Sequence, residues 1–305
     1  MSDFISDPLR NFLDAHARLN DYIKVSTAAV DFLKHSTTDE KELSARINQL
    51  ILDAGERWTS KTINKPYDYL SEVRNDLSKS AVINVYSAFD IFLSQVSGHM
   101  SEHANKELIA DSDDVKEVPE VSRITNFYKK LNWEITTIRP VLPVFRFYKV
   151  LRNCVAHNMG LANAALIAIA NSAEFEFAIK TWKTKFPKKT ISSPPVILDK
   201  AISLDPHHAI TYSDACLRIA RDMNLKMFGE LGLGYFIDKT LKKHLSDPKK
   251  LTEPKCSDLV SYIKCHLKLD YNIATTKDDI NAHFNDWKIK KVYKQQYKNM
   301  AALAL

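Results

Sequence analysis

Residues 81–93 read AVINVYSAFDIFL, and this stretch decides the fold class. Apolar side chains surround most of a helix drawn through it, which is typical of a helix that is buried on several sides. Asp90 is the charged residue inside the stretch, and a buried carboxylate needs a partner. We therefore predict a core helix over residues 69–100 in a mostly α-helical protein.

Apolar residues at helical spacing continue on both sides of this core helix. Lys65-Pro66-Tyr67 breaks the chain just before it, because proline interrupts a helix. Thr38 resembles an N-cap, and Thr276 with Asp279 three residues later resembles a capping box. Gly160 suits the left-handed residue that ends a helix. The further helices that we predict cover residues 9–33, 40–58, 124–131, 144–157, 162–186, 213–228, 257–267 and 276–293.

A different periodicity separates two of these helices. Apolar and polar residues alternate in residues 196–204 and 208–212, on either side of Asp205-Pro206-His207. Alternation of this kind predicts strands, and Pro206 suits the second position of a turn. We therefore expect a helical bundle with one small β-hairpin.

The composition favours a protein of a reducing compartment. Hydrophobic residues make up 45% of the chain, while the 6 glycines are too few for a fold built on many tight turns. The 4 cysteines show no C-x-x-C pairing, and the N-terminus lacks the features of a signal peptide. The longest apolar run, residues 161–170, is too short to span a bilayer. We expect a cytoplasmic protein with no membrane segment.

Positive charge is concentrated at the end of the chain. The net charge is +6, and the residues from Lys239 onward hold 14 Lys and 7 Asp or Glu, so they alone carry +7. Gly229, Gly232 and Gly234 precede this segment, and we interpret them as helix ends. We predict a helical domain over residues 1–235 and a basic helical subdomain over residues 236–305. Such a segment favours a polyanionic partner, although a solvated surface explains the charge equally well.

The sequence LRNCVAHNMG at residues 151–160 carries the candidate chemistry. Asn153 and His157 are four residues apart and share one face of a helix. Arg152 and His157 are separated by roughly 140° around the helix axis. Both can reach one phosphate only if His157 turns at the helix end or if a second copy of the chain contributes.

RNA cleavage without a metal needs these residue types. A base takes the proton from the 2′-hydroxyl group, an acid protonates the 5′-oxygen, and a cation neutralises the phosphorane. Histidine transfers protons near neutral pH, and arginine binds phosphate through two N–H groups. The alternative reading is a surface arginine and a capping histidine, which the spacing alone favours.

The segment Arg152-Asn153-Cys154-Val155-Ala156-His157 resembles the signature of the HEPN superfamily, and the following Asn158-Met159-Gly160 resembles the HNxG ending of several prokaryotic branches. The acidic, aromatic helix at residues 86–93 and the hairpin are similar to that family as well. The resemblance covers roughly residues 65–230. It implies a dimeric helical bundle that cleaves RNA at the dimer interface, in toxin–antitoxin systems or phage defence.

The resemblance also implies roles for individual residues. Arg152 would bind the phosphate, Asn153 would supply the polar second position, and His157 would act as acid and base. Asp90 and Asn158 would support them. It implies no cofactor and no metal, and it allows an antitoxin or another defence protein as a partner. Because some HEPN proteins bind RNA or proteins without cutting, a non-cleaving binding module is the alternative.

Basic residues outside the motif are candidates for RNA binding. Arg146 and Lys149 lie one to two helical turns before it, where a solvated face is an equally good explanation. In the last helix, lysines alternate with two tyrosines that could stack on bases, although apolar anchoring of that helix is the better interpretation. These residues are Lys290, Lys291, Lys294, Tyr293 and Tyr297.

Possible metal ligands occur in two places. His207 and His208 lie beside Asp205 and Asp214, but adjacent histidines on a strand point to opposite faces, so turn residues are the better interpretation. The second set lacks the spacing of a zinc finger, which argues against a structural zinc there. It consists of Cys256, Cys265 and His266.

Overall fold

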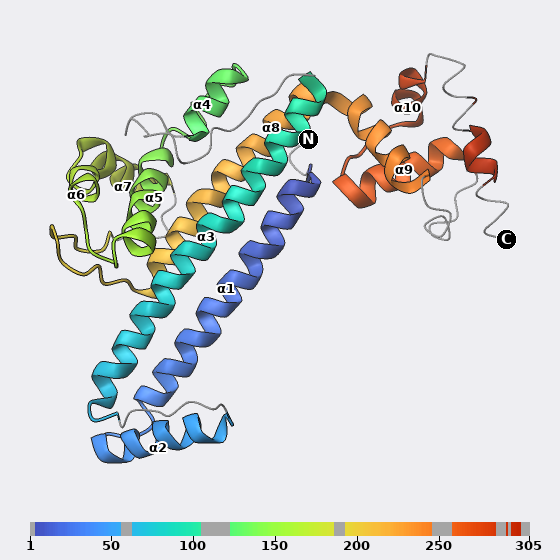
Figure 1. The fold of residues 1–305 in the computed structure, drawn as a ribbon. Helices are drawn as coiled ribbons and strands as arrows, with labels where there is room; N and C mark the ends of the chain where they lie inside the picture. The colour runs from blue at the N-terminus through green and yellow to red at the C-terminus, as the bar shows by residue number, and fades with distance from the viewer. Residues whose placement is uncertain are drawn as a thin grey trace. The chain divides into compact units, whose positions relative to one another are not determined.

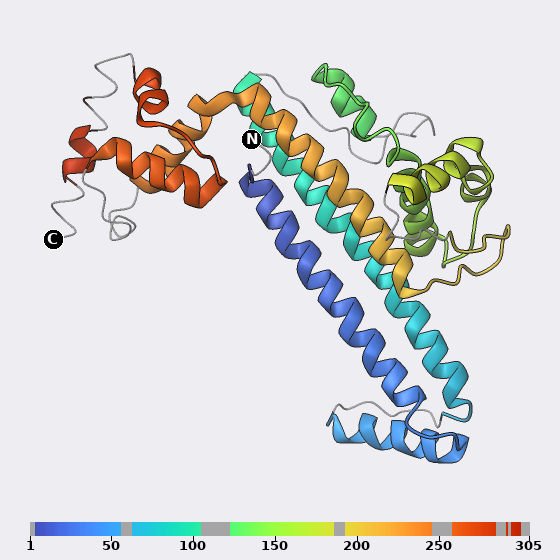
Figure 2. The ribbon, with the colours of Figure 1, turned by 180° about the vertical axis from the view of Figure 1, so that it is seen from behind.

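The computed structural model describes residues 4–55, 63–104, 123–185, 193–245, 258–284, 291 and 294–299 (Figures 1 and 2). It is mostly helical, and within these ranges no strand forms. None of the helices described is both long and apolar enough to cross a bilayer. The helices are α1 (Asp7–Lys34), α2 (Glu40–Asp53), α3 (Pro66–Ala104), α4 (Arg123–Lys130), α5 (Leu142–His157), α6 (Ala164–Ala170), α7 (Ala173–Lys185), α8 (Pro206–Leu245), α9 (Leu259–Tyr271) and α10 (Lys277–His283).

The chain divides into two compact units, each built from separate segments. Residues 12–91 and 134–219 form the first, which we call the motif unit because it contains residues 151–160. Residues 1–11, 92–133 and 220–305 form the second, which we call the terminal unit. α1, α3 and α8 each contribute to both.

Aromatic side chains build the core of the motif unit around α3. Phe89 is fully buried and meets Phe12 and Phe145 edge-on, with ring centroids 5.8 and 5.4 Å apart. Tyr148 of α5 stacks on Tyr212 of α8 at 5.4 Å. Burial of each such ring stabilises the fold by about 1.5–3 kcal/mol. The predicted core helix over residues 69–100 is therefore confirmed and is slightly longer than expected.

The terminal unit has its own aromatic core. Phe4 packs on Phe228 and Phe236, with ring centroids 4.6 and 5.0 Å apart. The buried amide of Asn224 accepts from Ser6 N and donates to Phe4 O, which fixes the start of the chain. The capping box of Thr276 and Asp279 is present at α10, as predicted.

The predicted β-hairpin is wrong. α8 begins at Pro206, so residues 208–212 are helical, and residues 193–204 make only an isolated bridge between Leu161 and Ala201. Pro206 fits a first helical position as well as a turn, because its φ is preset and its missing N–H needs no partner there. His208 N donates to Asp205 O at 3.0 Å and closes the first turn.

Three helix boundaries also differ from the predictions. Asp39 is the N-cap of α2 instead of Thr38, since its carboxylate accepts from Lys41 N and Glu42 N. The helix predicted over residues 162–186 is two helices, α6 and α7, separated at Asn171 and Ser172. α8 continues through the three glycines, and Gly232 alone interrupts it with φ 72° and ψ 170°.

Candidate functional site

The site lies at the C-terminal end of α5. Leu151 and Cys154 are buried on one side of this helix, which leaves Arg152, Asn153 and His157 on its outer side. The last turn closes when the amide of Gly160 donates to the carbonyl of Cys154 at 3.0 Å.

Two consecutive left-handed residues turn the chain away from α5. Gly160 has a φ of +75°, which confirms the prediction of a left-handed residue, and Met159 has a φ of +50°. Asn158 helps to hold this turn, because its side-chain amide donates to the carbonyl of Leu161 at 2.8 Å. That contact gives Asn158 a structural role beside the site.

Arg152 is held by two neighbours. Its Nη1 donates to Oδ1 of Asn153 at 3.0 Å, and its guanidinium carbon lies 4.5 Å from the centre of the Tyr86 ring. Tyr86 is only 5% exposed, so this cation–π contact is largely desolvated. The buried Nε of Arg152 has no hydrogen-bond partner within the described ranges. The guanidinium is thus fixed in direction, with bonding capacity that its described neighbours do not fill.

His157 is the last residue of α5, and its side chain is exposed. Among the described contacts, no hydrogen bond joins His157 to Arg152. The structure therefore brings Arg152 and Asn153 together, and it leaves His157 apart from them at the same end of the helix.

No family model, curated protein or solved structure matches this chain. A functional proposal must therefore start from the geometry of these residues. In that geometry, Arg152 packs against Tyr86 of α3.

One face of α3 supplies further charged groups near the motif. Lys79, Tyr86 and Asp90 are spaced by seven and four residues, so they lie along the same face. Lys79 Nζ lies 3.7 Å from the point where a Cβ at position 160 would stand. Asp90 is half-buried one turn beyond Tyr86. Sequence reasoning missed Lys79, although its spacing from Tyr86 was a usable signal.

The basic residues predicted to bind RNA differ in accessibility. Arg146 Nη1 lies 3.6 Å from the Glu174 carboxylate of α7, and Lys149 is only 7% exposed. RNA could not reach the Lys149 ammonium without a rearrangement. Lys291 and Lys294 are exposed, whereas Lys290 and Tyr293 lie outside the described residues.

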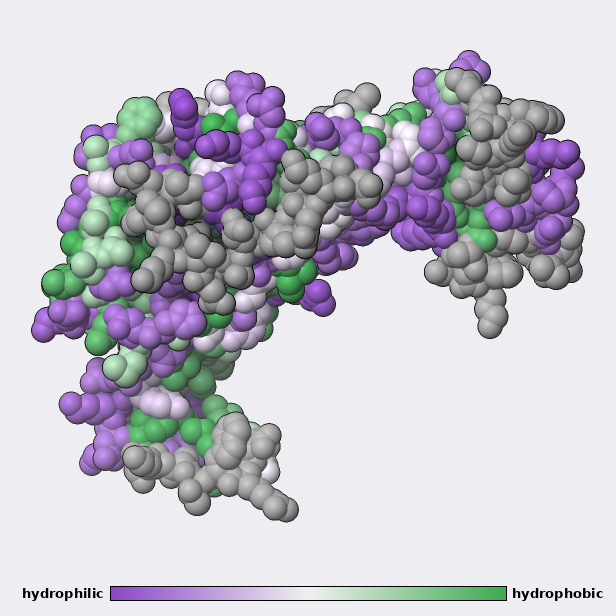
Figure 3. Space-filling view, turned by 45° about the horizontal axis from the view of Figure 1, so that its top comes forward, coloured by the Kyte–Doolittle hydropathy of each residue, from purple (hydrophilic) through white to green (hydrophobic). Residues whose placement is uncertain are grey.

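The C-terminal helices present a polar surface. In Figure 3, the described side chains of the C-terminal helices, at the right, are mostly hydrophilic. Tyr297 packs on the buried Tyr262, with ring centroids 5.2 Å apart. This contact fits apolar anchoring of the last helical segment better than base stacking by Tyr297.

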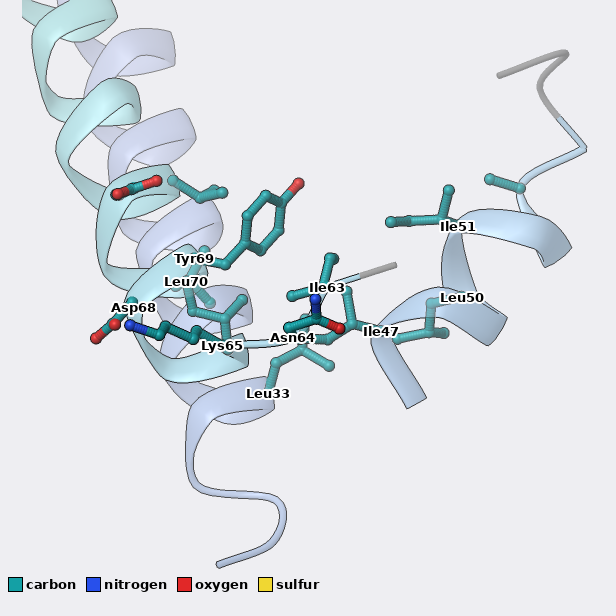
Figure 4. Close-up of a pocket in the computed structure, with 14 residues that line it drawn as sticks. Leu33, Ile47, Leu50, Ile51, Ile63, Asn64, Lys65, Asp68, Tyr69 and Leu70 are labelled. Atoms are coloured by element: carbon teal, nitrogen blue, oxygen red, sulfur yellow. The ribbon is translucent and has the colours of Figure 1, made fainter. Parts of the chain in front are cut away.

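A large pocket in the motif unit is chemically unlike this site. It has a volume of about 960 Å³ and lies among the end of α1, α2 and the start of α3. Figure 4 shows mainly aliphatic side chains, such as Leu33, Ile47 and Ile51, directed into it. Its charged groups, which include Lys65 and Asp68, stand at the edge. Among the residues that the structure describes, the lining offers no histidine or cysteine for acid–base or nucleophilic chemistry.

The possible metal ligands near residue 207 cluster more closely than predicted. Because His207 and His208 begin a helix instead of lying on a strand, one ligand atom from each of Asp205, His207 and His208 falls within 4.8 Å of the others. His208 Nδ1 is already 3.1 Å from the Tyr148 hydroxyl. Asp214 belongs to a separate ion pair with Arg218 at 3.0 Å.

Proposed function

We propose that this chain is a metal-independent endoribonuclease of the HEPN type. In this proposal Arg152 binds the scissile phosphate, Asn153 holds Arg152, and His157 transfers protons. The observation that supports it best is the fixed guanidinium, hydrogen-bonded by Asn153 and packed on Tyr86, at the same helix end as an exposed histidine. A toxin or defence effector, controlled by an antitoxin or another defence protein, is the setting that the resemblance favours.

The reaction follows from the chemistry of these groups. The 2′-oxygen attacks phosphorus, its proton passes to a neutral imidazole, and the bond from phosphorus to the 5′-oxygen breaks. An imidazolium protonates that oxygen, which leaves a 2′,3′-cyclic phosphate and a 5′-hydroxyl end. The guanidinium neutralises charge that develops on the phosphorane oxygens. Lys79, which lies near the Gly160 turn and pairs with Asp76 at 3.6 Å, would add a second cation beside the site.

A two-fold dimer would complete the site. Arg152 and His157 are five residues apart, and roughly 140° around the axis of one helix separates them. Two α5 ends that meet across a two-fold axis would offer two arginines and two histidines to one phosphate. We therefore propose that the active form is a homodimer with α5 at its interface.

The test uses purified protein and end-labelled RNA in the presence of EDTA. Wild-type protein should produce cyclic phosphate ends, and His157→Ala should lower the rate by at least about 100-fold, the usual scale for loss of a general acid or base. His35→Ala removes another exposed histidine, beside the end of α1, and should leave the rate unchanged. Full activity in His157→Ala, or an active species that light scattering shows to be a monomer, would contradict the mechanism.

A non-cleaving module that binds RNA or protein is the second candidate. It is favoured by the separation of His157 from Arg152 within one copy, because binding needs only the exposed surface. The same experiment distinguishes the two, since a binding module would retain RNA in a filter assay and leave it intact.

A further inference from the structure

Three potential metal ligands meet in the terminal unit, outside the candidate site. His244 lies in the last turn of α8, and His266 and Asp270 lie four residues apart on α9, so they share one face. One ligand atom from each falls within 4.8 Å of the other two. The two imidazole rings lie 3.8 Å apart, and His244 Nε2 is 2.5 Å from Asp270 Oδ2.

The cluster is buried and its bonding is incomplete. His244 is 8% exposed and His266 is 5% exposed. His244 Nδ1 and His266 Nε2 are both buried, and neither has a hydrogen-bond partner among the described residues. A buried ring nitrogen is costly to leave unbonded, so His266 Nε2, which faces this cluster, favours an added bonding partner.

A neighbouring lysine orients the carboxylate of Asp270 toward the two histidines. Lys243 Nζ lies 3.3 Å from Asp270 Oδ1 and leaves Oδ2 facing His244.

We propose that His244, His266 and Asp270 bind one divalent transition-metal ion, with Zn²⁺ as the best fit. The ion would lie between His244 Nε2 and Asp270 Oδ2, and His266 Nε2 would supply the third bond. His244 would bind as the neutral tautomer that carries its ring proton on Nδ1, so no group is left with an uncompensated charge. Imidazole nitrogens exclude Mg²⁺ and Ca²⁺, which prefer oxygen ligands.

The dimensions suit a tetrahedral ion. Bonds of about 2.0–2.1 Å imply ligand atoms about 3.3 Å apart. The separation of 2.5 Å between His244 Nε2 and Asp270 Oδ2 would have to widen, and His266 is within reach because the three ligand atoms all lie within 4.8 Å of one another. Side-chain rotations supply changes of this size, and water fills the fourth position. The bound ion would fasten the end of α8 to α9.

The test measures binding of Zn²⁺ to the full chain after treatment with EDTA and dialysis. Calorimetry should find one Zn²⁺ per chain, and Co²⁺ should give the visible absorption of a tetrahedral site. His266→Gln should weaken binding by at least about 100-fold, the upper end of the loss that follows removal of a supporting residue. Zn²⁺ should raise the melting temperature of the wild type and not that of the variant. If His266→Gln does not fold, Asp270→Asn takes its place.

Two control variants exclude other ligands. Cys265→Ala removes the thiol next to His266, and His207→Gln breaks the other cluster of possible ligands. Both should bind Zn²⁺ as the wild type does. Absence of stoichiometric binding to the wild type, or binding that survives in His266→Gln and is lost in either control, would overturn the proposal. RNA cleavage by folded His266→Gln in EDTA tests the proposed function separately, because Arg152 belongs to the other unit.

Discussion

Two histidine sites in this molecule have opposite surroundings. His157 is exposed at a helix end, beside an arginine that is held by Tyr86 and Asn153. His244 and His266 are buried, their tilted rings lie 3.8 Å apart, and His244 is hydrogen-bonded to the Asp270 carboxylate. An exposed histidine can exchange protons with a substrate, whereas a buried pair with incomplete bonding favours a fixed cation.

The contrast teaches that burial, more than residue type, distinguishes the two proposals. We propose an acid–base role for the histidine that a substrate can reach, and a ligand role for the two histidines that are buried. Each difference between the two sites can be tested by experiment, and the predictions below begin with the largest expected effect.

The first prediction is that the two histidine sites fail independently. His157→Ala should lower RNA cleavage by at least about 100-fold and leave one Zn²⁺ bound per chain. His266→Gln should lose Zn²⁺ binding and keep cleavage within about twofold of wild type. Cleavage rates and calorimetry on the same two preparations check this. A parallel loss of both properties in either folded variant would show that the sites are coupled.

The second prediction concerns pH and the buried site without metal. The unfolded chain protonates His266 near its ordinary pKa of 6.5, whereas the folded protein does so only near pH 4. The unfolded state therefore binds more protons in this window, so the free energy of unfolding falls as the pH is lowered from 6.5 to 4. The expected loss is about 2–3 kcal/mol.

Urea unfolding in EDTA at pH 7 and pH 4.5 measures this loss. The titratable and charged groups that face His266 are His244, Asp270 and Lys243. The pKa of Asp270 is lowered from its ordinary value of 3.8, so Asp270 titrates below the range from pH 6.5 to 4. His266→Gln should remove most of the pH dependence, while His207→Gln should keep it. An equal dependence in all three proteins would disprove the assignment to His266.

The third prediction tests the cation–π contact between Tyr86 and Arg152. Tyr86→Leu should lower kcat/KM for RNA by about fivefold, since a desolvated cation–π contact contributes on the order of 1 kcal/mol. Tyr86→Phe keeps the ring face and should stay close to wild type. Steady-state cleavage by both variants, with circular dichroism to verify folding, measures the effect. Equal rates in Tyr86→Leu and Tyr86→Phe would mean that the ring does not position Arg152.

The smallest expected effect concerns the basic end of the chain. Replacing the exposed Lys291 and Lys294 by Gln should flatten the log–log dependence of RNA affinity on salt by about 0.7 per lost phosphate contact. Lys24→Gln with Lys41→Gln removes the same charge from exposed positions of the motif unit and should change the slope less. Filter binding across a range of salt concentrations decides between an RNA-binding and a purely structural segment.

Much of the helical fold could be predicted because apolar residues recur at helical spacing in the sequence. Residues 81–93, within the core helix predicted over residues 69–100, are the plainest case, because they are apolar around most of a helix and therefore indicate burial on several sides. The hairpin failed because alternation over a few residues is a weak signal, and Pro206 starts a helix as readily as a turn. Asp39 and Thr38 are both good caps, and only the backbone geometry decides between them.

The two histidine sites differ in how much of each could be predicted from the sequence. Arg152, Asn153 and His157 lie within six consecutive residues, so their chemistry could be proposed from one short segment. The contact between Tyr86 and Arg152 depends on how α3 packs against α5, and no local sequence pattern predicts that packing. His266 and Asp270 are four residues apart, a spacing that the sequence shows. His244 lies on another helix, so the three residues do not have the spacing of a zinc finger and that pattern does not identify them.

Glycine positions on α8 illustrate how differently neighbouring residues will respond to mutation. Apart from the chain neighbours and the backbone of the same helix, no described atom lies within 4 Å of a Cβ placed at Gly229 or Gly232, so crowding by described residues protects neither position. Gly229 has ordinary helical backbone, and alanine there should stabilise the helix by about 1 kcal/mol. Gly232, with φ 72° and ψ 170°, occupies a conformation that is almost confined to glycine. Under random mutagenesis and selection for folded protein, position 229 should therefore drift freely, while position 232 should remain glycine.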